Sequence, residues 1–191
     1  MGNLVGILLA AGRGSRFGGD KLLHPLPDGT PMGVAAARSL RTAVDRVIAV
    51  TRPGDDHLAA LLREAGCTAI VAADAAKGMG HSLAAGVKAA PDAAGWLIAL
   101  GDMPFIQPET HRLVALAVRA GHAIVAPIFN GVRGHPVAFS SAWRESLLAL
   151  EGDAGARVLV QSAPGDLYGL PVADPGVVQD VDLRMALDTR I

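Results

Sequence analysis

The chain has 191 residues, 51% of them hydrophobic and 4% aromatic, which predicts one core built from layers of aliphatic side chains. Its 17 basic and 18 acidic residues give a formal net charge of −1 without long charge runs, so we expect no nucleic-acid or membrane partner. Cys67 is the single cysteine and is expected to be a buried thiol, and no uncharged apolar run reaches the roughly 18 to 20 residues of a membrane helix. The composition therefore predicts a soluble, cytoplasmic protein that binds small molecules.

Short apolar runs alternate with longer segments of helical periodicity through the first two thirds of the chain. The pattern predicts strands at Leu4–Leu9, Arg46–Val50, Thr68–Ala72, Trp96–Leu100 and Ala123–Ala126, and helices at Pro31–Ala43, Asp55–Glu64, Ser82–Ala89 and Pro108–Arg119. This alternation is typical of βαβ units. We expect an α/β fold of three layers, in which a mostly parallel sheet carries helices on both faces.

The periodicity loosens after Pro127. The predicted elements there are a turn flanked by short strands at 129–139, helices at Ser140–Leu150 and Ala154–Gln161, a last strand at Leu167–Val172, and a helix from Asp182 to about Asp188. No internal repeat or low-complexity linker interrupts the chain. Residues 1–191 are therefore predicted to form a single domain, with a less regular subregion at about 127–165.

The segment that follows the first predicted strand, Ala10-Ala-Gly-Arg-Gly-Ser-Arg-Phe-Gly-Gly-Asp-Lys21, is rich in glycine and carries Arg16 and Lys21. Ligands bind at the carboxyl ends of strands in an open parallel sheet. Glycines let backbone N–H groups converge on an anion, and the two cations add positive charge. The segment therefore predicts a phosphate-binding loop.

Two common phosphate-binding patterns do not match this loop. The Walker pattern requires Ser or Thr after Gly-Lys, but Lys21 lies between Asp20 and Leu22. The dinucleotide pattern Gly-x-Gly-x-x-Gly fails by one position, because Phe17 stands where its third glycine is required. An NADP-binding site with Arg52 on the 2′-phosphate stays open as an alternative.

Carboxylates follow the fourth predicted strand and precede the last predicted helix. Asp102 comes just after Trp96–Leu100 and is the first candidate for an Mg²⁺ ligand, since this ion takes one or two carboxylates and completes its shell with phosphate and water. Asp180 and Asp182 lie two residues apart, and one of them could complete the site. The alternatives are that Asp102 caps a turn and that Asp182 caps the last helix.

Three further glycine-containing segments carry polar side chains. Gly78-Met-Gly-His-Ser-Leu83 is expected to precede a helix with Ser82 as its N-cap, and Ala84 excludes a Gly-x-Ser-x-Gly nucleophile. Arg133-Gly-His-Pro-Val137 and Gly152-Asp-Ala-Gly-Ala-Arg157 could form a second anion pocket, or else a turn and a helix start capped by Asp153. The other four histidines are expected on the surface: His24, His57, His111 and His122.

Taken in chain order, these segments resemble the MobA-like NTP transferase family, and most closely its molybdenum cofactor cytidylyltransferase branch. The resemblance rests on six motifs, namely Leu9–Gly18 with Lys21, Gly78–Leu83, Gly101–Pro104, Arg133–Val137, Gly152–Arg157 and Asp180–Asp182. It implies a Rossmann-like nucleotidyltransferase fold. It also implies transfer of a nucleotidyl group to the terminal phosphate of molybdopterin, with release of pyrophosphate and use of Mg²⁺.

The resemblance also implies roles for individual residues. Nucleotide binding falls to Leu9, Ala10, Ala11, Gly12, Arg13, Gly14, Ser15, Arg16, Lys21, Gly78, Gly80 and Ser82. Arg16, Lys21 and Asp102 are the expected catalytic residues, and Asp102 with Asp182 is the expected metal site. The acceptor is expected to bind Arg133, Gly134, His135, Pro136, Asp153 and Arg157.

The Ala10-Ala11 pair goes with CTP rather than GTP in this family, and a molybdoenzyme or its chaperone is a further possible partner. Residues 72–77 depart from the family pattern, which leaves the base contacts there open, and Leu-Arg-Met after Asp182 replaces the usual Thr-Pro-Glu. Two rival interpretations remain. One is a nucleotidyltransferase with another phosphorylated acceptor such as a sugar phosphate, and the other is a non-catalytic protein that binds and delivers a pterin cofactor.

Overall fold

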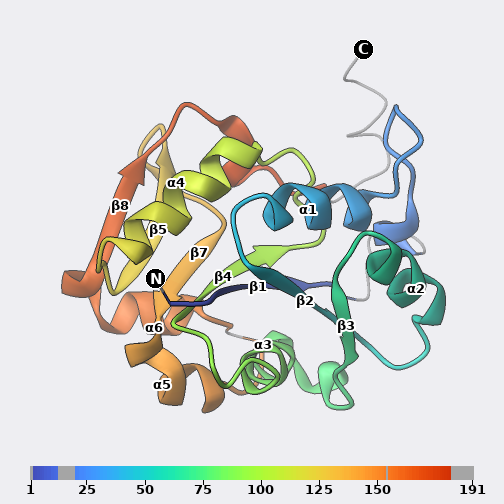
Figure 1. The fold of residues 1–191 in the computed structure, drawn as a ribbon, viewed down its shortest axis with the longest axis horizontal. Helices are drawn as coiled ribbons and strands as arrows, with labels where there is room; N and C mark the ends of the chain where they lie inside the picture. The colour runs from blue at the N-terminus through green and yellow to red at the C-terminus, as the bar shows by residue number, and fades with distance from the viewer. Residues whose placement is uncertain (1, 13–19, 154, 182–191) are drawn as a thin grey trace.

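The computed structural model describes residues 2–12, 20–153 and 155–181, and its eight strands belong to one sheet (Figure 1). The strands are β1 (Leu4–Leu9), β2 (Arg46–Thr51), β3 (Thr68–Val71), β4 (Gly95–Leu100), β5 (Ile124–Phe129), β6 (Val132–Arg133), β7 (Val137–Ser140) and β8 (Leu167–Pro171). The five strands predicted in the first part of the chain are confirmed to within a few residues. The strand predicted at Leu167–Val172 is confirmed as β8.

The sheet is mixed but mostly parallel, with the strand order β3-β2-β1-β4-β7-β5-β6 and with β8 paired to β5. Strand β1 pairs in parallel with β2 and β4, and β5 pairs in parallel with β8. Strand β7 runs antiparallel between β4 and β5. Asn130 and Gly131, both at positive φ, make the tight turn between β5 and β6, which confirms the predicted turn.

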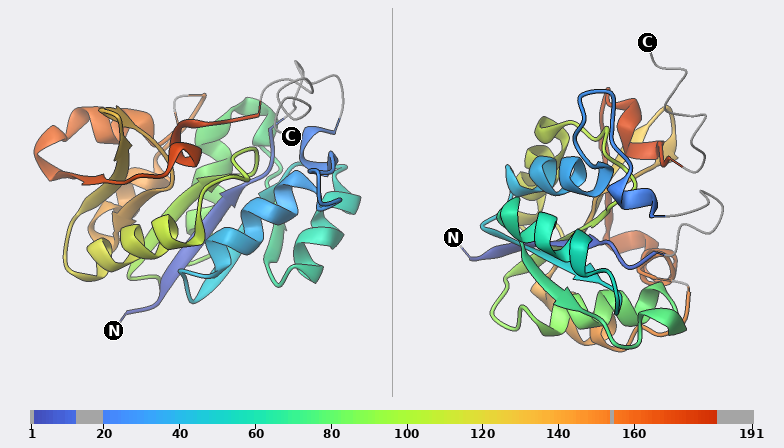
Figure 2. Two further views of the ribbon diagram at one scale, coloured as in Figure 1. Left: turned by 90° about the horizontal axis from the view of Figure 1, so that it is seen from above. Right: turned by 90° about the vertical axis from the view of Figure 1, so that its right-hand side faces the viewer.

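Helices cover both faces of the sheet, as predicted (Figures 1 and 2). They are α1 (Met32–Arg41), α2 (Asp56–Glu64), α3 (Met79–Lys88), α4 (Pro108–Arg119), α5 (Arg144–Leu148) and α6 (Arg157–Ser162). Side chains of α1, α2 and α4 join one buried cluster, and side chains of α3, α5 and α6 join the other. Strand β1 contributes Leu4 and Leu8 to the first cluster and Val5 and Ile7 to the second, so each face of the strand has its own core.

Two of the predicted helices are shorter than expected. A 3₁₀ turn at Ser141–Trp143 and the five-residue α5 replace the helix predicted at Ser140–Leu150. The helix predicted at Ala154–Gln161 begins only at Arg157, because Gly155 adopts a φ of 52°, which a right-handed helix does not allow. The helix predicted from Asp182 lies outside the described residues. None of the helices in the described part of the chain is long and apolar enough to cross a bilayer.

Residues 174–181, called the C-terminal segment below, connect α4 to the edge of the sheet where strands β1 and β4 end. The buried carboxylate of Asp174 accepts hydrogen bonds from the Gln107 N–H (2.9 Å), the Thr110 hydroxyl (2.7 Å) and the Gly176 N–H (2.9 Å). Further along, the Val177 carbonyl accepts from His135 N–H at 2.8 Å, and the Val181 N–H donates to the Asp102 carbonyl at 3.1 Å. The segment thus holds three parts of the chain together.

His111 does not lie on the surface as expected, because α4 turns it into the protein, where it is 2% exposed. Burial lowers the pKa of His111 from 6.5 to about 4, against the opposing effect of the nearby Asp174 carboxylate. The imidazole is therefore neutral near neutral pH. Cys67 is buried as predicted, and burial raises the pKa of its thiol.

Candidate active site

Strands β1 and β4 are parallel neighbours, and their ends, Leu9 and Leu100, lie side by side. The strands that follow β1 along the chain extend the sheet to one side, whereas β4 lies on its other side. A ligand crevice forms at such a switch point, because the two loops leave their strands in opposite directions. The glycine-rich loop and Gly101-Asp102 therefore leave the sheet at one place.

Lys21 and Asp102 meet at this point. The Lys21 Nζ atom lies 2.7 Å from Oδ2 of Asp102, and the lysine is only 8% exposed. A short 3₁₀ helix, Lys21–Leu23, turns the lysine inward from the end of the loop. Because the lysine is buried and the Asp102 side chain is 28% exposed, their attraction is stronger than that of a fully exposed ion pair. The predicted phosphate-binding cation and the predicted metal ligand are thus partners in this structure.

A cavity of about 340 Å³ opens over this ion pair. Its lining includes Leu9, Ala11, Gly12, Lys21, Leu22, Ala75, Ala76, Gly78, Met79, Ser82, Leu100, Asp102 and Asp153. Residues predicted from two separate motifs to bind nucleotide therefore share one cavity with Asp102. We call it the first cavity.

Two other residues predicted to bind nucleotide do not line the first cavity. Ala10 is buried, and its N–H donates to the Val50 carbonyl at 2.9 Å. Gly80 is buried too, and its N–H donates to the Gly152 carbonyl at 2.7 Å. Arg13, Gly14, Ser15, Arg16 and Asp182 lie outside the described residues.

A second cavity of about 260 Å³ adjoins the first. Its lining combines four polar or charged side chains predicted to bind the acceptor with apolar walls, and the four are Arg133, His135, Asp153 and Arg157. Leu9, Met79, Leu100 and Asp153 line both cavities, so the two spaces share a wall. Tertiary structure therefore brings the two loops predicted as a second anion pocket to one place beside the first cavity.

The two arginines of the second cavity carry charge that no described acid neutralises. Every ion pair among the described residues involves other cations, so neither Arg133 nor Arg157 forms a salt bridge with a described acid. An anionic ligand would therefore meet two available guanidinium groups here.

His135 lies in the second cavity, and its Nδ1 atom is buried without a hydrogen-bond partner among the described residues. Burial lowers its pKa, while hydrogen bonding to the Ile98 backbone and the carboxylates of Asp102 and Asp180 act in the opposite direction. Its neighbour Gly134 has a positioning role, because a Cβ there would lie 2.2 Å from the Val177 carbonyl oxygen. Gly134 and Pro136 do not line either cavity.

The prediction that Ser82 caps a helix is wrong, because α3 begins at Met79 with Gly78 as its N-cap. Gly78 takes a φ of 131°, a backbone conformation that strongly favours glycine. Ser82 is buried within α3 and faces the first cavity. The proposed cap at Asp153 is also wrong, since Ala156 precedes α6.

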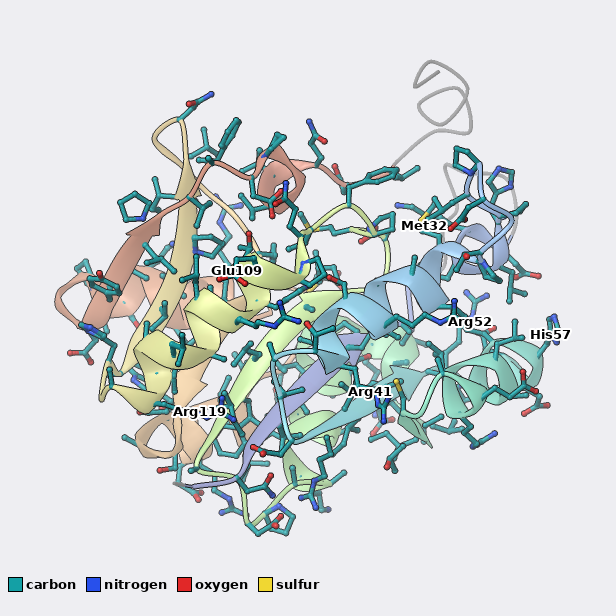
Figure 3. The ribbon with its side chains drawn as sticks, turned by 45° about the horizontal axis from the view of Figure 1, so that its top comes forward. Met32, Arg41, Arg52, His57, Glu109 and Arg119 are labelled. Atoms are coloured by element: carbon teal, nitrogen blue, oxygen red, sulfur yellow. The ribbon has the colours of Figure 1, made fainter. Side chains whose placement is uncertain are left out.

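A third, smaller cavity of about 100 Å³ lies on the other side of Lys21, lined partly by Arg52, Asp55 and His57. Nε of Arg52 lies 3.0 Å from Oδ1 of Asp55, so Asp55 already neutralises part of the charge that an NADP phosphate would require. Figure 3 shows Arg52 close to the body of the protein, whereas His57 points outward from α2. Three residues predicted to bind nucleotide, Ala10, Gly12 and Lys21, also line this cavity.

The residues at the first cavity fit a divalent cation that arrives with a nucleotide. No group of three or more His, Cys, Asp or Glu residues capable of holding a metal occurs within the described ranges. Asp102 and Asp153 are carboxylates that line the cavity, and the Val181 N–H bond to the Asp102 carbonyl places Asp180 close by along the chain. One or two carboxylates with phosphate oxygens and water suit Mg²⁺.

Fold and site together define a nucleotidyltransferase, and comparison with known proteins gives the family. A model of the MobA-like NTP transferase domain matches residues 6–167, so the chain belongs to the MobA-like NTP transferase family. This confirms the resemblance inferred from the six motifs.

Relatives and solved structures agree with the family. The purine catabolism protein PucB of Bacillus subtilis is 33% identical over 94% of this chain and 91% of its own length, and the nicotine blue oxidoreductase of Paenarthrobacter nicotinovorans is 30% identical over 94% and 92%. A probable molybdenum cofactor guanylyltransferase of Thermococcus gammatolerans is 32% identical over 75% and 73%. The crystal structure of Rv0371c from Mycobacterium tuberculosis has a TM-score of 0.83 at 29% identity and covers 98% of each chain, and that protein has also been crystallised with manganese (TM-score 0.79, 28% identity, 98% and 99% covered).

Proposed function

We propose that this protein transfers CMP from CTP to the terminal phosphate of molybdopterin and releases pyrophosphate, with Mg²⁺ as the metal. One observation carries the proposal. A cavity with a lysine–carboxylate pair shares a wall with a cavity that offers two arginines, so a nucleotide and an anionic acceptor can bind side by side. The proposal includes the assignment of residues 127–165 as the subregion that contributes most of the acceptor site within a single domain.

The lining of the second cavity favours an acceptor with a fused heterocyclic ring system over a sugar phosphate. Apart from Arg133, His135, Asp153 and Arg157 its walls are glycine and apolar residues, namely Leu9, Met79, Leu83, Ile98, Leu100, Val137, Gly155, Ala156 and Val160. A sugar would place several hydroxyl groups against surfaces that cannot bond to them, which costs free energy. A fused heterocycle gains from burying its faces there, and the arginines suit its phosphate.

The proposed choice of nucleotide is CTP. Ala11 and Gly12 line the first cavity, and the Ala10-Ala11 pair is the feature that goes with cytidine nucleotides in this family. GTP is the competing nucleotide, because one relative is described as a probable guanylyltransferase. The nucleotide assay below separates the two.

In the proposed reaction an oxygen of the acceptor phosphate attacks the α-phosphorus of CTP. A new P–O bond forms while the bond to the β-phosphate breaks, so that the pyrophosphate keeps the electron pair of the broken bond. A phosphate monoester is largely ionised near pH 7, since its second pKa is about 6, and the attack requires no general base. Lys21 at the first cavity would move from Asp102 to the phosphates and stabilise their charge.

Further charge stabilisation is assigned to groups outside the described residues and to the metal. Arg16 and the backbone of Gly12 to Ser15 would hold the β- and γ-phosphates. Asp102 with Asp182 would hold Mg²⁺, which supplies neutralisation of phosphate charge and orientation of the nucleotide. Asp180 is the alternative second ligand.

The decisive test offers CTP, GTP and ATP separately with Mg²⁺, each with molybdopterin, molybdenum cofactor or a hexose 1-phosphate, and measures pyrophosphate. We expect release with CTP and a molybdopterin-type acceptor, and only background release without an acceptor. Faster turnover with GTP would overturn the nucleotide choice. Turnover with the sugar phosphate alone would overturn the acceptor.

Two other classes of function are tested in the same experiment. Tight binding of the pterin without turnover of any nucleotide would show a delivery protein rather than an enzyme. Because one relative is named an oxidoreductase, an arm with NADPH and the same acceptors measures loss of absorbance at the nicotinamide band. The proposal requires that this arm stay at background.

A further inference from the structure

The loop at residues 151–156, described except for residue 154 and called the acceptor loop, lies against the first turn of α3. The Gly80 N–H donates to the Gly152 carbonyl at 2.7 Å. In return, the Gly152 N–H donates to Nδ1 of His81 at 3.2 Å. The two segments are 71 residues apart in sequence, yet hydrogen bonds in both directions join them.

The contact is close enough that it depends on glycine. A Cβ on Gly78 would lie 2.3 Å from the Gly152 carbonyl group and 2.7 Å from Oδ1 of Asp153. A Cβ on Gly80 would lie 2.7 to 2.9 Å from the backbone of Glu151. The backbone of the acceptor loop therefore packs directly against the first turn of α3.

This joint lies between the two cavities. On the α3 side, Gly78, Met79 and Ser82 line the first cavity, and Met79 and Leu83 line the second. On the loop side, Gly155 lines the second cavity and Asp153 lines both. The attachment of the loop to α3 therefore bears on the position of the two cavities relative to each other.

His81 supplies a side-chain bond to this joint without lining either cavity. A backbone N–H is always a donor, so Nδ1 must be the acceptor and the ring proton must be on Nε2 when the ring is neutral. Removing the imidazole would leave the Gly152 N–H without this partner. Polar groups left unpaired in this way weaken the conformation that needs them.

We propose that His81 is a positioning residue, which fixes the acceptor loop on α3 so that the acceptor cavity keeps its place beside the nucleotide cavity. This inference rests on the proposed two-substrate reaction. In such a reaction a misplacement of about 1 Å between the reacting groups can cost about 100-fold in rate. The acceptor side should suffer first, because α3 is a regular helix packed on the sheet whereas the loop depends on the joint.

The test compares His81→Leu, which removes the hydrogen-bond acceptor, with His81→Asn, whose amide oxygen can take the place of Nδ1. His122→Leu is the matched control, since His122 is an exposed histidine that lines neither cavity. Amide hydrogen exchange of the peptide spanning 150–157 is measured in each variant, with CTP affinity measured by calorimetry in the presence of Mg²⁺. Pyrophosphate release then gives KM for CTP and for the molybdopterin-type acceptor.

We expect exchange of the loop peptide to accelerate about tenfold in His81→Leu and to return to within about threefold of wild type in His81→Asn. The acceptor KM should rise about tenfold in His81→Leu, while CTP affinity stays within about twofold. Three results would overturn the inference. They are an unchanged hydrogen-exchange rate in His81→Leu, an equal loss of affinity for CTP and for the acceptor, and an exchange rate in His81→Asn as fast as in His81→Leu. If no variant, wild type included, uses the acceptor, the proposed function fails, and the exchange and calorimetry still decide the role of His81.

Discussion

The two halves of the site differ in how they handle charge. In the first cavity the cation and the acid are already paired, with Lys21 and Asp102 2.7 Å apart. In the second cavity, Arg133 and Arg157 have no acidic partner among the described residues. A nucleotide that arrives with a metal brings its own positive charge, whereas an acceptor phosphate that arrives alone does not. This contrast agrees with the proposal that the first cavity binds the nucleotide with its metal and the second binds the acceptor.

The halves also differ in what positions them. The first cavity is built on β1 and β4, which are adjacent parallel strands. The second depends on the hairpin and antiparallel β7, on the acceptor loop and on the C-terminal segment, which are joined by contacts between distant parts of the chain. Substitutions at the first cavity should therefore affect the reaction itself, whereas substitutions in the elements that position the second cavity should affect its structure.

The largest effect is expected at the first cavity. Asp102→Asn should lower turnover roughly 10²- to 10³-fold, because it removes the anchor proposed for the metal at the point where phosphate charge develops. Pyrophosphate release at saturating substrates measures it. Asp166→Asn, at an exposed acid before β8, is the control and should leave turnover unchanged. Undiminished release by Asp102→Asn would remove Asp102 from the proposed mechanism.

The next effect is expected in the support of the second cavity. Gly134→Ala would place a Cβ 2.2 Å from the Val177 carbonyl oxygen and should lower the free energy of unfolding by about 2 to 3 kcal/mol. Urea denaturation measures the loss. Gly165→Ala is the matched control, because no heavy atom lies within 4 Å of the new Cβ, and it should change stability by less than about 0.5 kcal/mol. Equal effects of the two substitutions would contradict this account.

Acid should destabilise the packing of the C-terminal segment on α4 through His111, which lies close to Asp174. The pKa of His111 is about 4 when folded and about 6.5 when unfolded, so the unfolded chain binds more protons as pH falls between these values. The stability from this group is complete above about pH 6.5, and about 2 kcal/mol should be lost between pH 6.5 and 4.5.

Urea denaturation across this pH range measures the loss attributed to His111, with His111→Phe as the comparison. The variant should show a shallower dependence. Some slope should remain, because the pKa of His135 is lowered in the folded protein as well. The assignment is wrong if the wild type and His111→Phe lose stability in parallel.

The smallest effect tests the unpaired charges directly. Arg157→Ala should raise the acceptor KM about tenfold and leave the CTP KM within about twofold, since Arg157 lines only the second cavity. Steady-state kinetics with each substrate varied in turn measures both. Arg112→Ala removes an exposed arginine that pairs with Glu109 on α4 and serves as the control. A change in the CTP KM of more than about twofold would show that the two cavities do not bind their substrates independently.

Sequence patterns predicted the regular half of the molecule well, because local periodicity reports the burial of strands and helices against a sheet. The strands β1 and β4, their parallel direction, and the placement of Lys21 and Asp102 after them all followed from short-range signals. The ion pair between Lys21 and Asp102 did not, since 81 residues separate them. His111 shares the buried face of α4 with Val114, Ala115 and Val118, so helical spacing indicated a burial that its polar side chain did not suggest.

The sequence by itself determined the α/β class and the family and predicted a phosphate-binding loop, because glycine spacing and apolar periodicity are local properties that one chain displays directly. Only the tertiary structure decided that β7 lies between β4 and β5, that Arg133 and Arg157 share a cavity, and that His81 joins the acceptor loop to α3. These features depend on packing between segments far apart in the chain. They require close approach of backbone segments, as at Gly78 and Gly134, where a Cβ would collide with a distant part of the chain. A sequence motif shows that a glycine is present but does not show which segment packs against it.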